Sequence, residues 1–314
     1  MTDRCHDHDG RVLARLERPT AAEPTRLAVL ADVHLATDAT GTWKVFHRTE
    51  RHLRAAVECV NERAVDGVLV AGDLTRNGVP EEFDLFDDLA AFDPPTVAIP
   101  GNHDFPTTFD ERESLPIPEF EARYTPDGLP FRVELGGLEV IGLDSHAATP
   151  GSPAETWDGR IDADQLLWLD EVLTDADPES AIVTVHHNLP ATGELYERYS
   201  AELPVAGDVP GFTNPQPLVD LLAMRDAALV VTGHLHFPAV QRDDGVTELT
   251  VPAVSSFPHA LLLLEVDERG TTVRFVPLTD ADGMVESIAH GHEKDRVLLS
   301  AAQLATAPLV DDFA

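Results

Sequence analysis

Short runs of apolar and β-branched residues alternate with amphipathic stretches over the first hundred residues of this chain. The runs at residues 27–31, 68–71 and 96–99 are typical of buried strands, and the stretches at 46–64 and 81–91 place their apolar residues on one helical face. An alternation of strands and helices indicates parallel strands joined by crossover helices. The sequence therefore predicts an α/β domain built on a parallel sheet.

The remainder of the chain predicts further elements of both kinds. Other strands and helices are expected at residues 131–135, 138–143, 162–173, 181–185, 218–224 and 228–232, the first two forming a hairpin around Gly136-Gly137. Residues 249–251, 261–266 and 271–277 are expected as antiparallel strands that form a second sheet. The segment 107–128 is expected as an insertion or lid over the site, and 192–216 as a polar loop.

A length of 314 residues suits one large α/β domain or two small ones, and a hydrophobic fraction of 43% is enough for a sizeable core. We expect the main domain at residues 25–280. An N-terminal tail and edge segment would precede it at 1–24, with a short edge strand at 12–16. A C-terminal tail would follow at 281–314, with a short helix at 297–304.

The chain carries a formal net charge of −34 from 56 acidic and 22 basic residues, and Lys44 and Lys294 are its only lysines. A surface of this kind is typical of proteins that work in high salt, where the Debye length falls to about 3 Å at 1 M. We therefore expect a halophilic source. The same charge disfavours nucleic acid and anionic membranes as partners, because both are bound through clustered lysine and arginine.

Cysteine content and the N-terminal residues indicate the compartment. Cys5 and Cys59 are too few for a disulfide framework, so free thiols in a reducing compartment are expected. The N-terminal residues contain no apolar signal-peptide region, and no apolar run approaches the length of a membrane span. The sequence therefore predicts a cytoplasmic protein.

Five of the predicted strands are followed directly by residues of metal-binding type. Taken alone, each of these residues is more often a turn or cap residue than a ligand. All of them, however, lie at the carboxyl ends of strands, where open α/β sheets place their binding sites. We therefore expect one site that contains Asp32, His34, Asp73, Asn102, His103, His186, His234 and His236.

Carboxylates, imidazoles and one amide oxygen form a ligand set that transition metal ions accept, rather than calcium. Two ions can be held if Asp73, from the middle strand, binds both. Residues two apart in an extended strand point to the same side, so Asp32 and His34 can share an ion. The expected ligands are Asp32, His34, Asp73 and His236 for the first ion, and Asp73, Asn102, His186 and His234 for the second.

Two ions about 3.5–4 Å apart lower the pKa of a shared water and bind both oxygens of an in-line displacement on phosphorus. His103 is not needed as a ligand and is expected to face the phosphate, as a transition-state stabiliser or as the proton donor to the leaving oxygen. Asp104 is expected to orient His103 through a ring N–H. His186 is preferred as the ligand because it directly follows its strand, and His187 is expected to support the site or face the substrate.

These motifs resemble those of the calcineurin-like metallophosphoesterase family, in the family's order and over about residues 27–236. The resemblance rests on Asp32-x-His34, Gly72-Asp73, Gly101-Asn102-His103-Asp104, His186 and Gly233-His234-x-His236. It implies a four-layer α/β/β/α sandwich of two mixed β-sheets flanked by helices. It also implies phosphoester hydrolysis at a dinuclear centre of iron, manganese or zinc, divalent or of mixed valence, with Asp73 bridging the ions and His103 aiding catalysis.

Within this family, the chain is similar to the class III cyclic-nucleotide phosphodiesterases and glycerophosphodiesterases. The similarity rests on Gly142-Leu143-Asp144-Ser145, on Gln165-Leu166-x-Trp168-Leu169, and on His186-His187 with Asn214 ahead of Gly233. The chain departs from this group at Asn188-Leu189-Pro190 and in the loop at 193–216. The resemblance implies a phosphodiesterase that acts on a small soluble diester such as a cyclic nucleotide, by attack of a metal-bridging hydroxide on phosphorus.

Other functions stay open for the same residues. A phosphomonoesterase or protein phosphatase would use the same site but would turn over a monoester faster than a diester. A nuclease would need a DNA-capping domain and a basic surface, and the sequence predicts neither. A non-catalytic metal-binding scaffold is disfavoured by the intact His103 and by both ligand sets. A homodimer also stays open, because relatives often pair through their C-terminal regions.

If the acidic surface is an adaptation to salt, dialysis from molar salt into low-salt buffer should unfold the chain, because unscreened carboxylates repel one another. Circular dichroism across a salt series measures the loss of structure. Equal stability with and without salt would contradict the halophilic interpretation.

Overall fold

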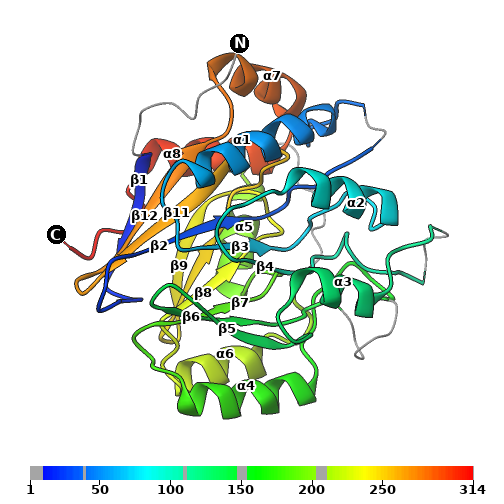
Figure 1. Ribbon diagram of the computed structural model, residues 1–314. Coiled ribbons are helices and arrows are strands. Elements are labelled where there is room, and N and C mark those ends of the chain that lie inside the picture. Colours follow the sequence, from blue (N-terminus) through cyan, green and yellow to red (C-terminus); the bar gives the residue numbers. More distant parts are fainter. Residues whose placement is uncertain (1–9, 38–39, 109–111, 147–153, 203–210, 314) are drawn as a thin grey trace.

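The computed structural model describes residues 10–37, 40–108, 112–146, 154–202 and 211–313. In this part of the chain, two six-stranded mixed sheets pack against each other and helices cover their outer faces (Figure 1). The expected α/β/β/α sandwich is confirmed. Residues 1–9, which include Cys5, lie outside the described residues.

The first sheet has the strand order β1-β12-β11-β2-β3-β4. Its strands are β1 (Arg11–Leu16), β2 (Thr25–Leu30), β3 (Gly67–Ala71), β4 (Thr96–Ile99), β11 (Ala260–Asp267) and β12 (Gly270–Pro277). β2, β3 and β4 are parallel and are joined through α1 (Thr49–Asn61) and α2 (Pro80–Leu89), with the 3-10 helix η1 (Phe46–Arg48) ahead of α1. This is the predicted arrangement of parallel strands and crossover helices, and β1 is the predicted edge strand.

The strands near the C-terminus do not form a second sheet of their own, so that prediction was wrong. β11 pairs antiparallel with β2, and β12 pairs with β11, so both extend the first sheet. The cause lies in β11, whose first five residues, 260–264, are all buried. A strand that is apolar on both faces fits the interior of a covered sheet better than a sheet with one solvated face.

The second sheet has the order β5-β6-β7-β8-β10-β9. Its strands are β5 (Phe131–Leu135), β6 (Leu138–Gly142), β7 (Ala181–Thr184), β8 (Leu229–Thr232), β9 (Ala239–Asp243) and β10 (Val246–Thr250). The predicted hairpin is confirmed as β5 and β6, and Gly136 takes a left-handed conformation in its turn, with φ 63°. β6, β7, β8 and β10 are parallel, and α4 (Ala163–Asp175) and α6 (Gln216–Met224) cover their outer face.

Four further helices occupy segments expected as loops or tails. α3 (Ile117–Tyr124) lies in the expected lid, and α5 (Pro190–Ser200) begins two residues before the expected polar loop and extends into it. α7 (Ala281–Gly291) and α8 (Asp295–Thr306) lie in the expected C-terminal tail, and α8 contains the short helix predicted at 297–304. The loop prediction was therefore wrong for the residues of α5. Proline suits the first position of a helix, and Tyr196 stacks on Phe237 with ring centroids 6.1 Å apart. The expected domain limits stay a prediction.

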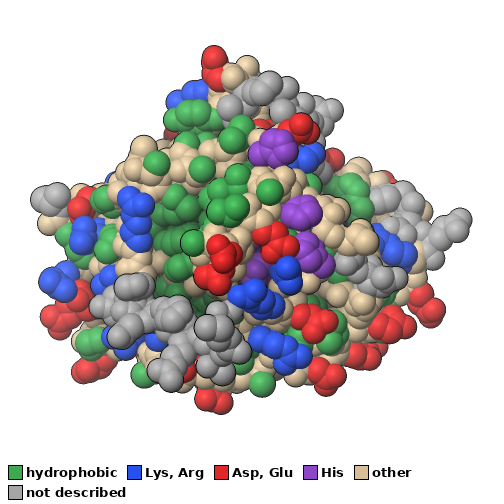
Figure 2. Space-filling view, turned by 90° about the horizontal axis from the view of Figure 1, so that it is seen from above, with side chains coloured by type: hydrophobic (Ala, Val, Ile, Leu, Met, Phe, Trp, Pro, Cys, Tyr) green, Lys and Arg blue, Asp and Glu red, His purple; other side chains and the backbone are tan. Residues whose placement is uncertain are grey.

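Charged side chains cover much of the molecular surface. Figure 2 shows one face on which acidic side chains are spread along the edges, while several histidines lie near the middle beside basic and acidic groups. Among the described residues, no helix is long and apolar enough to cross a membrane.

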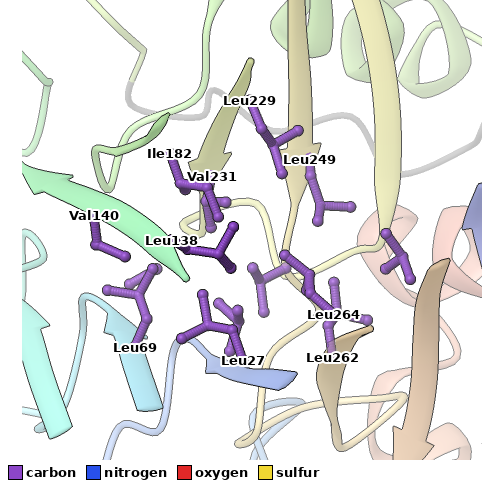
Figure 3. Close-up of a cluster of buried hydrophobic side chains, with 14 of the residues drawn as sticks. Leu27, Leu69, Leu138, Val140, Ile182, Leu229, Val231, Leu249, Leu262 and Leu264 are labelled. Carbon is purple, nitrogen blue, oxygen red and sulfur yellow. The ribbon is translucent and has the colours of Figure 1, made fainter. Parts of the chain in front are cut away.

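The main hydrophobic core lies between the two sheets (Figure 3). Leu27, Leu69 and Leu262 from the first sheet face Val140 and Ile182 from the second, and all five are essentially inaccessible to solvent. Each buried aliphatic side chain of this kind contributes about 1.5–3 kcal/mol to folding. The core therefore fixes the two sheets against each other, and with them the strand ends that carry the polar motifs.

Candidate metal centre

The five predicted strand ends converge at one edge of the sandwich. Each of β2, β3, β4, β7 and β8 ends two or three residues before the first candidate side chain that follows it. A hydrogen bond joins the two sheets here, because the backbone N–H of His234 donates to Asp32 Oδ2 at 3.0 Å. The expected convergence is therefore confirmed, whereas metal binding by these residues stays a prediction.

The first group of side chains contains Asp32, His34 and His236, whose nearest ligand atoms lie within 4.8 Å of one another. His236 Nε2 is 3.1 Å from Asp32 Oδ1 and 3.2 Å from His34 Nε2. All three residues are buried. This group corresponds to the first predicted ligand set.

Asp73 lies between this group and a second one. Its Oδ2 atom is 3.3 Å from His34 Nε2 and 3.5 Å from His186 Nε2. Asp73 therefore occupies the position expected of a residue that bridges two ions. Asn102 and His234 lie on the His186 side, with Asn102 Oδ1 2.9 Å from His234 Nδ1 and the His186 and His234 ring centroids 5.3 Å apart.

Several atoms aimed into these groups fit a metal ion. Asp32 Oδ1 and His186 Nε2 are buried and have no hydrogen-bond partner among the described residues, which is costly unless a cation satisfies them. The opposite ring nitrogens are occupied, since His186 Nδ1 lies 2.8 Å from the Ala71 carbonyl and His236 Nδ1 lies 2.8 Å from Ser256 Oγ. Such contacts fix the orientation of metal-binding imidazoles. The donor set therefore fits a dinuclear transition-metal site.

Electrostatics keep most of these imidazoles in the form that binds metal. Burial lowers the pKa of His34, His234 and His236 well below the usual value, so they are neutral. His186 differs: burial lowers its pKa, but the interactions with Asp73, the charge of Asp32 and the contact with the Ala71 carbonyl together outweigh burial and raise the pKa to about 9. The neighbouring imidazoles in turn outweigh the burial of Asp73 and hold its pKa well below the usual value.

The backbone at the candidate ligands is left-handed rather than extended. Asp32, His34, Asp73, His234 and His236 have φ values of 53°, 44°, 54°, 65° and 63°. The assumption that Asp32 and His34 lie on extended backbone was therefore wrong, although their side chains do meet. This conformation costs roughly 1–2 kcal/mol per residue. Backbone contacts hold it in place, including those from Asp32 N–H to the Gly72 carbonyl (3.0 Å) and from His34 N–H to the Asp73 carbonyl (2.9 Å).

Two glycines allow Asp73 and His186 to approach their neighbours. A Cβ atom on Gly101 would lie 2.2 Å from Asp73 Oδ1, and one on Gly72 would lie 2.3 Å from His186 Nδ1. Gly72 also has a φ of 92°. Both positions therefore require glycine.

His103 lies beside the centre with its ring partly exposed. Its backbone N–H donates to Asp73 Oδ1 at 2.8 Å, and its Nδ1–H donates to the Arg76 carbonyl at 2.7 Å. Its ring meets His34 edge-on and stacks on Trp157, with centroids 4.6 and 5.2 Å apart. Burial and the charge of Lys44 lower its pKa to about 4.

Asp104 does not orient His103, so this prediction was wrong. The Arg76 carbonyl occupies the ring nitrogen, and Asp104 accepts hydrogen bonds elsewhere. Its Oδ2 atom accepts from the N–H groups of Leu74 and Gly101, both at 3.0 Å. Its Oδ1 atom accepts from the N–H and hydroxyl of Thr75 at 2.9 and 3.0 Å. Asp104 thus ties the loop after β3 to the loop after β4.

His187 supports the site rather than facing it. It is buried, with Nδ1 2.8 Å from Ser145 Oγ and Nε2 3.1 Å from the Trp157 carbonyl. The next residue, Asn188, donates from Nδ2 to Glu248 and to Thr232 Oγ1 at 3.1 and 2.7 Å. The departure at Asn188 is therefore part of a buried network that joins the ends of β7 and β8.

Several residues around the centre were not predicted. Lys44 Nζ lies 3.0 Å from His34 Nε2, and Trp43 lies over His236 with ring centroids 5.2 Å apart. Arg296, from α8, donates to the His234 carbonyl at 3.4 Å. The rarity of lysine and tryptophan in this chain is the only sequence signal that could have pointed to the first two.

Comparison with known sequences places this site in context. A family profile described as "Calcineurin-like phosphoesterase" matches residues 25–238. A probable cyclic nucleotide phosphodiesterase from Synechococcus sp. is 26% identical over 266 residues, which cover 82% of this chain and 94% of that protein. A 3′,5′-cyclic adenosine monophosphate phosphodiesterase from Vibrio vulnificus is 24% identical over 300 residues, which cover 92% of this chain and 93% of that protein.

Solved structures share the fold at low sequence identity. A dimetal phosphatase from Danio rerio superposes with a TM-score of 0.57 at 17% identity, over 82% of this chain and all of that one. A purple acid phosphatase from yellow lupin gives a TM-score of 0.54 at 13% identity, over 83% of this chain and 53% of that one. These likenesses support the architecture of two packed sheets.

Replacing Asp73 with asparagine should lower the metal content of the protein, because the amide removes the negative charge between His34 and His186. We expect metal affinity to fall by at least tenfold. Plasma mass spectrometry of dialysed, manganese-loaded protein measures the bound ions. Asp84→Asn, on the exposed side of α2, is the matched control, and two ions retained by Asp73→Asn would exclude bridging.

Asp104→Asn should destabilise the fold, because an amide nitrogen would face backbone N–H donors that now share one carboxylate. A loss of about 2 kcal/mol is expected from chemical unfolding at constant salt. Asp84→Asn again serves as the control. An unchanged unfolding midpoint would show that these hydrogen bonds do not hold the two loops together.

Proposed function

This chain belongs to the calcineurin-like phosphoesterase family, and from that premise we propose that it is a dinuclear metal-dependent phosphodiesterase acting on a small soluble diester such as a cyclic nucleotide. The proposal rests on the two buried Asp/His groups that meet at Asp73. Metal-dependent phosphoester hydrolysis is the activity that such a centre serves in this family. The preference for a diester is the more specific part of the proposal.

The ligand assignment follows from the groups described above. Asp32, His34, Asp73 and His236 would hold one ion, and Asp73, Asn102, His186 and His234 would hold the other. Bound together, the ions would supply Lewis acidity that activates water and balances charge on the phosphoryl oxygens. The contacts from Ala71 and Ser256 would hold His186 and His236 in the ligating orientation.

His103 is the protein's own group for the reaction. Its Nδ1–H is held by the Arg76 carbonyl and its backbone N–H by Asp73, so the ring is fixed at the edge of the centre. The opposite nitrogen, Nε2, would contact a phosphoryl oxygen or the leaving oxygen. For this role Nε2 must be protonated, a form that the negative charge of a bound phosphoryl group would favour; the imidazolium would then stabilise developing charge or pass its Nε2 proton to the leaving group.

A diester is favoured by the relatives that align over most of the chain. Proteins named as a probable cyclic nucleotide phosphodiesterase and a 3′,5′-cyclic adenosine monophosphate phosphodiesterase align with 82% and 92% of it, and a probable glycerophosphodiester phosphodiesterase from Arcobacter nitrofigilis, also named for a diester, is 31% identical over 39%. Among diesters, the longer alignments favour a cyclic nucleotide. A direct test of the substrate distinguishes a diester from a monoester.

That test compares hydrolysis of bis(p-nitrophenyl) phosphate and p-nitrophenyl phosphate. Metal-free protein is assayed in high salt, before and after addition of manganese, zinc or iron. We expect metal-dependent turnover with the diester preferred. Preference for the monoester would indicate a phosphomonoesterase or protein phosphatase, and metal-loaded protein inactive on both esters would contradict an esterase.

His103→Ala should lower kcat by about 10²- to 10⁴-fold while the protein still binds its metals, because the ring is placed to act on the phosphoryl group and not as a ligand. Turnover of the diester and metal content are measured on the same preparation. Metal lost together with activity would assign His103 to the ligand set instead.

A further inference from the structure

Three cationic side chains around the candidate centre have no acidic partner. Most described arginines form ion pairs with Asp or Glu, for example Arg18 with Asp226 and Arg123 with Asp84. In the described part of the chain, Lys44, Arg76 and Arg296 form no such pair, although the chain holds 56 acidic residues against 22 basic ones. Arg160 and Arg198 also form no ion pair among the described residues but are exposed to solvent, whereas these three are half-buried, where a cation is costly without an anion beside it.

These three residues approach the centre from different segments. Lys44 Nζ lies 3.0 Å from His34 Nε2, and the Arg296 guanidinium lies 3.4 Å from the His234 carbonyl. The Arg76 guanidinium lies over the Phe46 ring at 4.3 Å, and its carbonyl accepts from His103. An anion bound at the centre would therefore have positive charge on more than one side.

Two of the three tryptophans of the chain flank the same centre. The Trp43 ring lies 5.2 Å from the His236 ring, and the Trp157 ring stacks on His103 at 5.2 Å and 20°. Both side chains are partly exposed. Aromatic faces of this kind stack on flat ring systems, including nucleobases.

The segment 43–48, which contains Trp43 and Lys44, is held in place by helices α7 and α8. Arg296 lies 5.6 Å from the Trp43 ring and 5.9 Å from the Tyr196 ring. Further along the same segment, Glu286 of α7 pairs with His47 at 2.9 Å and with Arg48 at 3.1 Å. The contacts that hold this segment therefore come from Glu286 and Arg296, which lie beyond position 238, where the family match ends.

We propose that Trp43, Lys44 and Arg296 form a substrate-recognition site, in which the two cations bind the phosphate and Trp43 stacks on a flat aromatic group joined to it. The substrate class is then a nucleoside phosphodiester rather than a diester of aliphatic alcohols. This inference rests on the proposed phosphodiesterase function for its choice of substrate. The binding of phosphate beside the centre does not depend on which ester is cleaved.

The first experiment measures the binding of inorganic phosphate to the metal-loaded protein by calorimetry at one fixed high salt concentration. Arg296→Gln should weaken binding about tenfold, because a hydrogen bond to a charged group is lost, while metal content stays unchanged. Arg296→Lys should restore part of the affinity. Arg225→Gln removes the same charge from α6, where Arg225 pairs with Asp170, and should bind phosphate as the wild type does. Unchanged binding by Arg296→Gln, or loss of metal in that variant, would overturn the proposal.

The second experiment compares adenosine 3′,5′-cyclic monophosphate with glycerophosphocholine as substrates. Trp43→Ala should lower kcat/KM for the cyclic nucleotide about tenfold more than that for the aliphatic diester, whereas Trp43→Phe should retain most of the preference for the cyclic nucleotide. An equal loss on both substrates, or a wild type that prefers glycerophosphocholine, would overturn the aromatic part of the proposal. If the wild type cleaves neither diester, the proposed function fails, and the phosphate titration still decides the role of Arg296.

Discussion

The carboxylate of Asp73, buried between imidazoles from separate strands, is the contact on which the arrangement of this centre depends. Its Oδ2 atom faces His34 from the first sheet and His186 from the second, and its Oδ1 atom accepts the backbone N–H of His103. The same residue accepts the N–H of His34 at its carbonyl. A buried negative charge is costly unless cations or donors surround it, so Asp73 both requires and positions the groups around it.

Much of this site could be predicted because each strand is recognisable from its own local sequence. A short apolar run followed by Asp or His marks a strand end, and parallel strands bring such ends to one edge. What the sequence could not indicate depends on distant parts of the chain. β11 pairs with β2 although they are more than 200 residues apart in the sequence, and no local pattern distinguishes that partner from a neighbour in a second sheet.

Details of the site also depend on contacts that the sequence does not show. The role of Asp104 was predicted wrongly because the Arg76 carbonyl, three residues past Asp73, accepts the ring N–H of His103. The left-handed backbone at Asp32 and His234 likewise follows from contacts between the sheets and not from residue type.

The charge near the candidate centre differs in sign from the charge of the chain as a whole, which is strongly negative. A net charge of −34 repels an anionic substrate at long range, whereas in the proposed site Lys44 and Arg296 would attract it over a few ångströms. Salt screens the first effect far more than the second, because dissolved ions surround exposed charges but do not enter between partly buried groups in contact. A protein of this composition can therefore bind an anion in brine without a basic surface to collect it.

The strand order also determines when this molecule can be completed during its synthesis. β2, β3 and β4 leave the ribosome early. The edge of β2 that faces away from β3, however, pairs with β11, which is synthesised much later, and Arg296 follows later still. Until those residues emerge, the nascent chain presents β2 with an unpaired, apolar edge, which is a surface prone to association with other chains. A premature stop between residues 238 and 260 would keep every strand end of the metal centre and still leave the first sheet without β11 and β12.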